Sequence, residues 1–325
     1  MVWAVRFKNP HQYNRVENMT MKLVFLGTGG SYPSKERNLA CVALRMMDGE
    51  VVLFDCAEGT QRQMMYTSIS FMQVKCILLS HFHGDHFLGL PGLVQTMYLN
   101  ERKDPLDIYG PPKTERRIEG LLGLGHFNPT FPITVHDLEG GQVIKRNGYN
   151  IKATWANHGV PDMGFSIEED PRPGKFDKPK ALELGIPEGY LFGKLQRGET
   201  VTVDGKTFTP DMVLGPARKG RKVVYTGDTA PCDAIEELAK DADVLIHDST
   251  GGTDIEDRMN QWGHTSSRQA AQIAKKANVK TLFLTHISPR YKEEEAKPLL
   301  DDAVAIFPNT LLAKDFFEYD VPFPE

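Results

Sequence analysis

Several features that mark particular classes of protein are missing from this sequence. Its 325 residues include only four cysteines (Cys41, Cys56, Cys76 and Cys232), and no two are spaced as CxxC, so we expect neither a disulfide framework nor a cysteine-based metal site. A membrane-spanning helix needs about 18 or more consecutive apolar residues, and the sequence has no such run. The first 20 residues lack the apolar core of a secretory signal. These absences predict a cytoplasmic protein with reduced thiols and no membrane span.

What is present is an alternation of apolar strand patterns and amphipathic helix patterns. Hydrophobic residues make up 40% and charged residues 25% of the chain, as in ordinary globular domains. Strands are predicted at 22–28, 41–46, 51–56, 75–80, 150–156, 222–226, 243–247 and 281–285. Helices are predicted at 60–66, 90–100, 113–122, 232–240, 266–277 and 293–305. The pattern indicates an α/β fold whose sheets are covered by helices on their outer faces.

The domain organisation follows from two segments that differ from the rest. Residues 1–20 are expected to be an amino-terminal extension, with Met19 or Met21 as alternative starts, and residues 21–325 to form the main domain. Residues 171–220 hold many Pro, Gly and Lys residues with little periodicity, and we interpret them as an inserted flexible arm. From Arg172 to Lys222 there are 11 Lys and Arg against 6 Asp and Glu, a net charge of +5, whereas the whole chain carries −5. The rest of the chain is therefore −10, and positive charge is concentrated in the arm.

The sequence HFHGDH directly follows a predicted buried strand and crowds three histidines and an aspartate into six positions. Such groups pack poorly in a core but are good ligands for a divalent metal. Neighbouring side chains point apart, so they cannot all reach one ion. We predict that His81 and His83 share one metal, while Asp85 and His86 face a second.

Further ligands are expected just past other strand ends. His158, Asp228 and His286 each follow a predicted strand. Taken singly, each is more simply a capping or turn residue, but the repetition favours metal binding. His264 lies in a polar loop before a helix, where a loop role is the simpler alternative. His247 ends a predicted strand and could border the site, but a structural or supporting role is an equally good interpretation. Arg290 could bind phosphate or could simply be an exposed surface residue.

These motifs, together with several longer phrases, resemble one protein family. The phrases are LGTGGSYPSKERN, FDCAEGTQRQM, SHFHGDHFLGLPGL, YGPP, KGRKVVYTGDT, GHTSS and LTHISPRY. The chain resembles the ribonuclease Z branch of the metallo-β-lactamase superfamily, with Ala57 and the segment 185–190 as departures from the family pattern. The resemblance implies a four-layer αββα sandwich that carries the basic arm.

The resemblance also implies a chemistry. It places His81, His83 and His158 on one zinc ion, Asp85, His86 and His286 on a second, and Asp228 between them. Metal-bound hydroxide would attack the phosphodiester, with Asp85 accepting its proton and His264 protonating the leaving 3′ oxygen. The expected activity is removal of the 3′ trailer from precursor tRNA, leaving a 3′-hydroxyl on the tRNA and a 5′-phosphate on the trailer.

The expected partners are precursor tRNA, held by the basic arm, and a second copy of the chain in a homodimer, the latter by resemblance alone. One alternative is a small-molecule metallohydrolase or phosphodiesterase of the same superfamily, which has no need of a basic arm. A second alternative is an RNA-binding relative without activity, which should have lost ligands, whereas all seven positions are filled here.

Overall fold

The structure is a computed structural model that describes residues 20–292 and 294–324. The predicted extension, residues 1–20, lies outside the described residues except for Thr20, and so does Met19. Within the described part of the chain, no helix has the length and apolarity that a membrane span requires.

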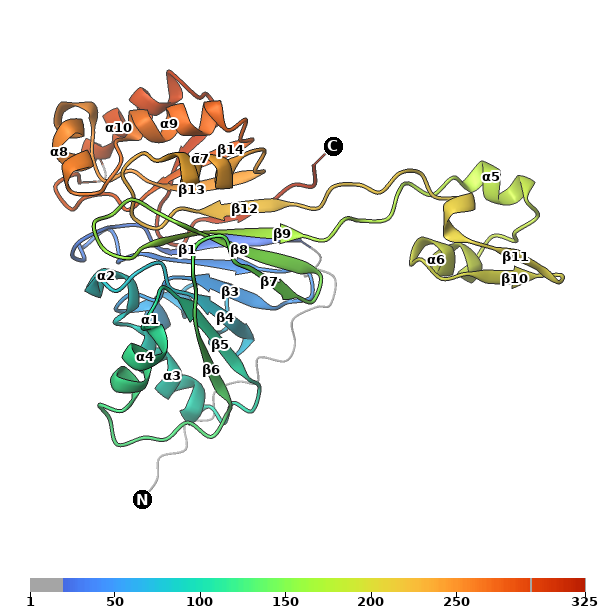
Figure 1. Cartoon of the computed structure of the whole chain (residues 1–325), viewed down its shortest axis with the longest axis horizontal. Helices are drawn as coiled ribbons and strands as arrows, with labels where there is room; N and C mark the ends of the chain where they lie inside the picture. Colours follow the sequence, from blue (N-terminus) through green and yellow to red (C-terminus); the bar gives the residue numbers. More distant parts are fainter. Residues whose placement is uncertain (1–19, 293, 325) are drawn as a thin grey trace.

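Two seven-stranded mixed sheets form the centre of the molecule (Figure 1). In order across the first sheet, the strands are β16 (Glu318–Asp320), β1 (Lys22–Gly27), β2 (Cys41–Arg45), β3 (Val51–Phe54), β4 (Val74–Leu78), β5 (Leu106–Gly110) and β6 (Ile133–Asp137). In order across the second, they are β15 (Thr310–Leu312), β14 (Thr281–Thr285), β13 (Val244–Asp248), β12 (Lys222–Tyr225), β9 (Met163–Glu169), β8 (Tyr149–Trp155) and β7 (Val143–Arg146).

Helices cover the outer face of each sheet. The helices α1 (Thr60–Met64), α3 (Leu90–Leu99) and α4 (Thr114–Leu122) lie against the first sheet. The helices α7 (Asp233–Ala239), α9 (Ser267–Lys276) and α10 (Lys297–Val304) lie against the second. Two further short helices are α2 (Gly84–Phe87) and α8 (Glu256–Gln261), and 3₁₀ turns occur at Phe71–Gln73, Pro210–Met212, Thr253–Ile255 and Glu294–Ala296. The predicted four-layer αββα sandwich is confirmed.

The core between the sheets comes from alternate strand residues. Phe25 and Phe54 of the first sheet and Phe165 and Phe283 of the second are all fully buried there. Burying one such side chain contributes about 1.5–3 kcal/mol relative to leaving it exposed. A Phe165→Ala change should therefore destabilise the sandwich by about 3–5 kcal/mol, because a cavity adds to the lost transfer free energy.

Strand directions determine where the polar strand ends meet. β12, β13 and β14 are parallel, and β8 runs in the same direction because both β8 and β12 pair antiparallel with β9. In the other sheet β3 and β4 are parallel. The residues after β8, β12 and β14 therefore lie at one edge of the second sheet, where they can face the loop that follows β4.

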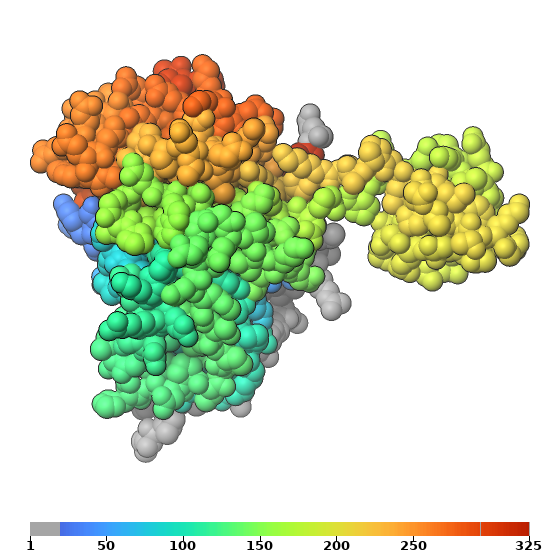
Figure 2. All heavy atoms as spheres, in the orientation of Figure 1, coloured from blue at the N-terminus to red at the C-terminus, as the bar shows by residue number. Residues whose placement is uncertain are grey.

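Residues 171–220 leave the sandwich after β9 and return at β12, and Figure 2 shows them as a separate lobe on a narrow stalk. The sequence predicted no regular structure here, but the lobe contains α5 (Lys178–Glu183), α6 (Tyr190–Gln196) and a hairpin of β10 (Val201–Val203) and β11 (Lys206–Phe208). Its own apolar cluster consists of Ala181, Ile186, Phe192, Leu195, Val201, Phe208 and Val213. At the base of the stalk, the guanidinium groups of Arg172 and Arg221 lie 3.7 and 4.1 Å from the ring centre of Phe323.

Several strands of the sandwich were absent from the prediction. β7 is half exposed and lacks the apolar alternation on which strand prediction depends, whereas Ile133 and Val135 give β6 a short alternation that was overlooked. β9 does show such an alternation, because Met163, Phe165 and Ile167 face the core, and this signal was overlooked.

Candidate metal centre

All seven predicted ligands gather at the shared edge of the sandwich. Those of the HFHGDH sequence follow β4, the last two within α2, and the others follow β8, β12 and β14. Their donor atoms form three groups in which all atoms lie within 4.8 Å of one another: His81 with His83 and His158; Asp85 with His86 and His286; and Asp228 with His81 and His86. Asp228 and His286 also belong to a fourth such group, with Asp248 and His264.

Asp228 links the first two groups. Its Oδ2 atom lies 3.2 Å from Nε2 of His286 and 3.3 Å from Nε2 of His86. The same oxygen lies 3.7 Å from Nε2 of His158 and 3.9 Å from Nε2 of His81. Two donors bound about 2.0–2.1 Å from a tetrahedral zinc ion are themselves about 3.3 Å apart, so these spacings suit donors that share an ion. A carboxylate in this position can bridge two cations.

Three buried histidine nitrogen atoms have no protein partner, and this indicates whether the centre can bind a metal ion. Among the described residues, Nε2 of His81, His86 and His286 makes no hydrogen bond of acceptable geometry. An unsatisfied buried polar atom costs about 1–3 kcal/mol, so three together are not explained by packing. Burial, followed by the neighbouring charge of His86, holds the pKa of His81 well below its usual range. A neutral imidazole is the form that binds metal, so His81 is held in the state of a ligand, and the three unpartnered nitrogen atoms fit a divalent cation.

The opposite ring nitrogens are held in place by the protein. Nδ1 of His86 lies 2.7 Å from Oδ2 of Asp55, and the same oxygen accepts hydrogen bonds from Tyr225 (2.7 Å) and the Ser80 hydroxyl (2.9 Å). Nδ1 of His158 donates to the carbonyl of Gly263 over 2.8 Å. Such partners fix the tautomer and the orientation of a metal-binding histidine.

A second buried carboxylate lies behind His81. Oδ2 of Asp162, which is fully buried, lies 2.8 Å from Nδ1 of His81. A Cβ atom at Gly227 would lie only 2.5 Å from the other Asp162 oxygen, so the absence of a side chain there makes room for this carboxylate. Gly227 also has a φ of +63°, which favours glycine.

The loop after β1 closes the centre on the side of Asp85 and His286. The backbone N–H of Ser31 donates to Oδ2 of Asp85 over 2.6 Å. A Cβ atom at Gly30 would lie 2.3 Å from the His286 ring, so this close approach requires glycine. His286 has a φ of +57°, and its Nδ1 lies 2.9 Å from the hydroxyl of Thr250. A non-glycine residue held in this strained conformation is typical of functional sites.

His264 borders the centre and is paired with an aspartate. Its Nδ1 lies 2.9 Å from Oδ2 of Asp248, and its ring centre lies 4.8 Å from that of His158. Burial lowers the pKa of His264, but the charge and hydrogen bond of Asp248, together with Asp228, outweigh it and raise the pKa to about 9. With Nδ1 bound to Asp248, the proton on Nε2 is the one that His264 can donate.

The two remaining candidates are His247 and Arg290. His247 is fully buried and its Nδ1 lies 2.8 Å from the Asp248 carbonyl, but it belongs to none of the donor groups in the described part of the chain. Arg290 is exposed, and its Nε donates to the hydroxyl of Ser288 over 3.1 Å.

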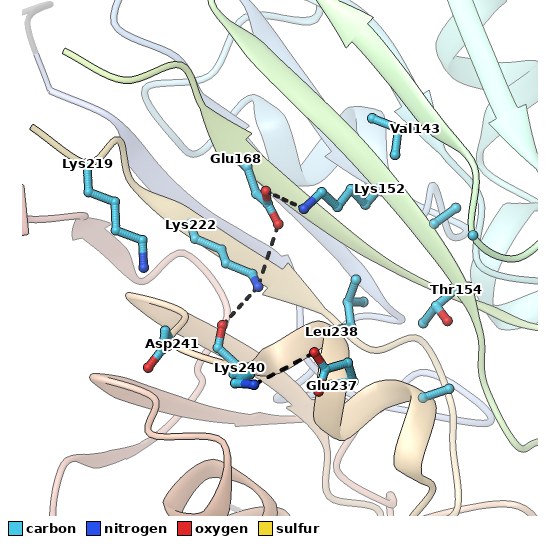
Figure 3. A pocket seen from close by; sticks show the side chains of 13 residues that line it. Val143, Lys152, Thr154, Glu168, Lys219, Lys222, Glu237, Leu238, Lys240 and Asp241 are labelled. Atoms are coloured by element: carbon cyan, nitrogen blue, oxygen red, sulfur yellow. Dashed lines mark hydrogen bonds and ion pairs between the residues drawn. The ribbon is translucent and has the colours of Figure 1, made fainter. Parts of the chain in front are cut away.

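A surface hollow of about 480 Å³ lies elsewhere, between β8, β9, β12 and α7 (Figure 3). It is lined by four lysines, and Glu168 pairs with Lys152 (2.7 Å) and Lys222 (3.5 Å). None of the predicted ligands lines it, so it is separate from the histidine centre.

Comparisons with known proteins show which family the chain belongs to. Residues 21–166 match the family described as anti-Pycsar protein Apyc1, and residues 206–287 match the β-lactamase superfamily domain. A ribonuclease Z from Archaeoglobus fulgidus is 45% identical over 312 residues, which cover 94% of this chain and 100% of the relative. One from Methanosarcina acetivorans is 44% identical, covering 93% and 99% respectively. This chain belongs to the ribonuclease Z family.

The solved structures fit the same family. The crystal structure of the short form of human tRNase Z is 28% identical, with a TM-score of 0.69, and covers 93% of this chain and 100% of that chain. The metallo-β-lactamase fold protein YhfI from Bacillus subtilis has a TM-score of 0.66 at 19% identity, which shows the fold alone.

In this member of the ribonuclease Z family the predicted ligands lie together, but the buried aspartates that contact their histidines and His264 were not predicted. Asp55, Asp162 and Asp248 were all missed. Asp55 follows a buried strand, as the predicted ligands do, and that position was the available signal. Asp248 is the last residue of β13, directly after His247, and this position at a strand end was the available signal. Asp162 lies directly before β9, and the apolar alternation of that strand, which was overlooked, was the signal that could have placed it.

Proposed function

We propose that this chain is a zinc-dependent endoribonuclease that removes the 3′ trailer from precursor tRNA. The products are a 3′-hydroxyl on the tRNA and a 5′-phosphate on the trailer. The observation that carries the proposal is the position of Asp228 between two groups of His and Asp donors, in a chain that matches ribonuclease Z relatives over nearly their whole length.

The donor groups suggest how two zinc ions would be held. His81, His83 and His158 would bind one, Asp85, His86 and His286 the other, and Asp228 would contact both. When bound, the two ions lower the pKa of a water molecule and draw negative charge from the phosphodiester.

Two side chains would handle protons. Asp85 would accept the proton of the attacking water, the role that the family resemblance gives it, and its carboxylate lies 3.7 and 3.5 Å from Nε2 of His86 and His286. His264 would protonate the leaving 3′ oxygen from Nε2, because Asp248 holds its Nδ1 and favours the protonated ring.

The arm, residues 171–220, would clamp the phosphates of the tRNA. Its net charge with the flanking residues is +5, and Lys175, Lys178, Lys180 and Lys206 are exposed. Among the aromatic residues of the arm, Tyr190 is available for RNA contact, since it is 74% exposed. Phe192 is buried in the core of the lobe, and Phe176 lies against it with ring centres 4.8 Å apart.

We further propose that the enzyme is a cytoplasmic homodimer in which the arm of one subunit serves the centre of the other. The arm joins the sandwich after β9 and before β12. Asp162 precedes β9 and Asp228 follows β12, so the arm is attached at the opposite ends of these strands from the metal centre. The lobe also projects away from the sandwich (Figure 2), so it is better placed to hold RNA at the metal centre of a partner subunit than at its own.

The test is a pair of substrates given to the zinc-loaded protein: a 3′-extended precursor tRNA and bis(p-nitrophenyl) phosphate. Efficient cleavage of the precursor at its trailer supports the proposal. Cleavage of the small ester alone would instead indicate a small-molecule phosphodiesterase. Light scattering after gel filtration reports the mass, and a monomer of 36.5 kDa would contradict the dimer.

A further inference from the structure

Trp262 is an exposed aromatic side chain at the border of the metal centre. It follows the last residue of α8 and is 47% exposed. The next residue, Gly263, accepts a hydrogen bond from His158, and the one after that is His264. Because consecutive Cα atoms are about 3.8 Å apart, Trp262 begins within about 7.6 Å of the His264 Cα atom.

The backbone holds Trp262 in a fixed position relative to His264. The N–H of Trp262 donates to the carbonyl of Met259 over 3.0 Å, and the N–H of His264 donates to the same carbonyl over 2.9 Å. Gly263 has a φ of +76°, and a Cβ atom there would lie 2.6 Å from the His158 Cα atom. The turn is therefore packed directly against a predicted metal ligand.

One face of the Trp262 ring already has a partner. The guanidinium group of Arg258, one turn earlier on α8, lies 4.5 Å from the ring centre. This cation–π contact restrains the ring while much of it stays exposed to solvent. An aromatic ring that is restrained and still accessible is a suitable surface for stacking an unpaired nucleobase.

The position of the leaving oxygen identifies the base that would reach Trp262. His264 is proposed to protonate the leaving 3′ oxygen, and that oxygen belongs to the last nucleotide kept by the tRNA. The base of this nucleotide, and not a base of the trailer, is therefore carried on the ribose nearest His264. We propose that Trp262 stacks on that base and so positions the scissile phosphate; this inference rests on the proposed function.

The experiment is a double-mutant cycle on the zinc-loaded full chain. One axis is Trp262→Ala, and the other is removal of the base, as an abasic site, from the last nucleotide before the cleaved bond. With the intact substrate, Trp262→Ala should lower kcat/KM by roughly 5- to 150-fold, the range for loss of one base–aromatic stack. With the abasic substrate, the same substitution should have little further effect. Trp262→Phe should restore most of the loss, and cleavage of bis(p-nitrophenyl) phosphate should stay unchanged.

Tyr32 provides a matched control. It is 63% exposed and follows Ser31, whose N–H binds Asp85, so it borders the attacking side of the same centre. Any effect of Tyr32→Ala should be the same on the intact and abasic substrates. If Trp262→Ala lowered kcat/KM equally on both substrates, or on neither, the inference about Trp262 would be overturned while the proposed function would stand. If the parent protein failed to cleave precursor tRNA, the proposed function would fall and this inference with it.

Discussion

Replacing His264 with alanine should separate proton donation from metal binding. The substitution removes the partner of Asp248, but that carboxylate keeps hydrogen bonds from the N–H of Thr229 (3.1 Å) and from the N–H and hydroxyl of Thr250 (3.0 and 2.7 Å). The loss of one charge-assisted hydrogen bond costs on the order of 1–3 kcal/mol, which a domain stable by about 5–15 kcal/mol can tolerate. We therefore expect a folded variant.

The seven predicted ligands are untouched by His264→Ala, so it should retain about as much zinc as the parent. Cleavage of precursor tRNA should fall by about 10²–10⁴-fold, equivalent to about 3–5 kcal/mol of transition-state stabilisation. A nitrophenyl ester has a good leaving group and needs little protonation, so its cleavage should fall much less. The assays are zinc content by mass spectrometry and single-turnover rates on both substrates.

The control for His264→Ala is His83→Ala, which should lose metal and both activities together. Missing zinc in the His264 variant, or equal losses on the two substrates, would show that His264 is a ligand or a structural residue and would refute the reasoning.

Three further predictions follow from the contacts of the centre and the arm. Asp248→Asn removes the charge that raises the pKa of His264 to about 9, so the alkaline limb of kcat/KM, which falls as His264 loses its proton, should move to lower pH; an unmoved limb would contradict this pairing. Asp55→Asn should weaken zinc affinity by about 10- to 100-fold in a chelator competition, because the Asp55 carboxylate lies 2.7 Å from Nδ1 of His86 and orients its ring. Unchanged affinity would show that Asp55 does not orient this ligand. Replacing residues 171–220 with a short Gly-Ser linker should preserve zinc content and small-ester cleavage while weakening precursor-tRNA binding and reducing its salt dependence; equal processing at all salt concentrations would exclude the clamp.

The sequence was most informative about side chains that follow buried strands. His158, Asp228 and His286 were proposed as ligands because each comes after an apolar run, and parallel strand directions do bring these ends to one edge. Recognising each strand and the side chain after it needs only a local pattern. The directions of the strands in the sheet then decide which strand ends meet. The prediction left the role of His247 open and did not consider its neighbour Asp248. The two are adjacent on β13 and point to opposite faces, so the aspartate and not the histidine joins the donor groups.

The secondary structure of the arm was harder to predict, for a different physical reason. Its small core joins residues as distant in sequence as Ala181 and Val213, through segments of only three to seven residues. Such short elements have no room for a helical or strand period, so the segment was expected to lack regular structure. Its basic charge, which depends on composition alone, was visible in the sequence.

The most direct test of the proposed activity is to map the ends of the products made from one 3′-extended precursor tRNA by the zinc-loaded protein. We expect one cut at the trailer, a tRNA that ends in a 3′-hydroxyl and a trailer that begins with a 5′-phosphate, and no cut by an Asp228→Ala variant. A 2′,3′-cyclic phosphate on the tRNA, or the same products from the Asp228 variant, would contradict hydrolysis at this centre.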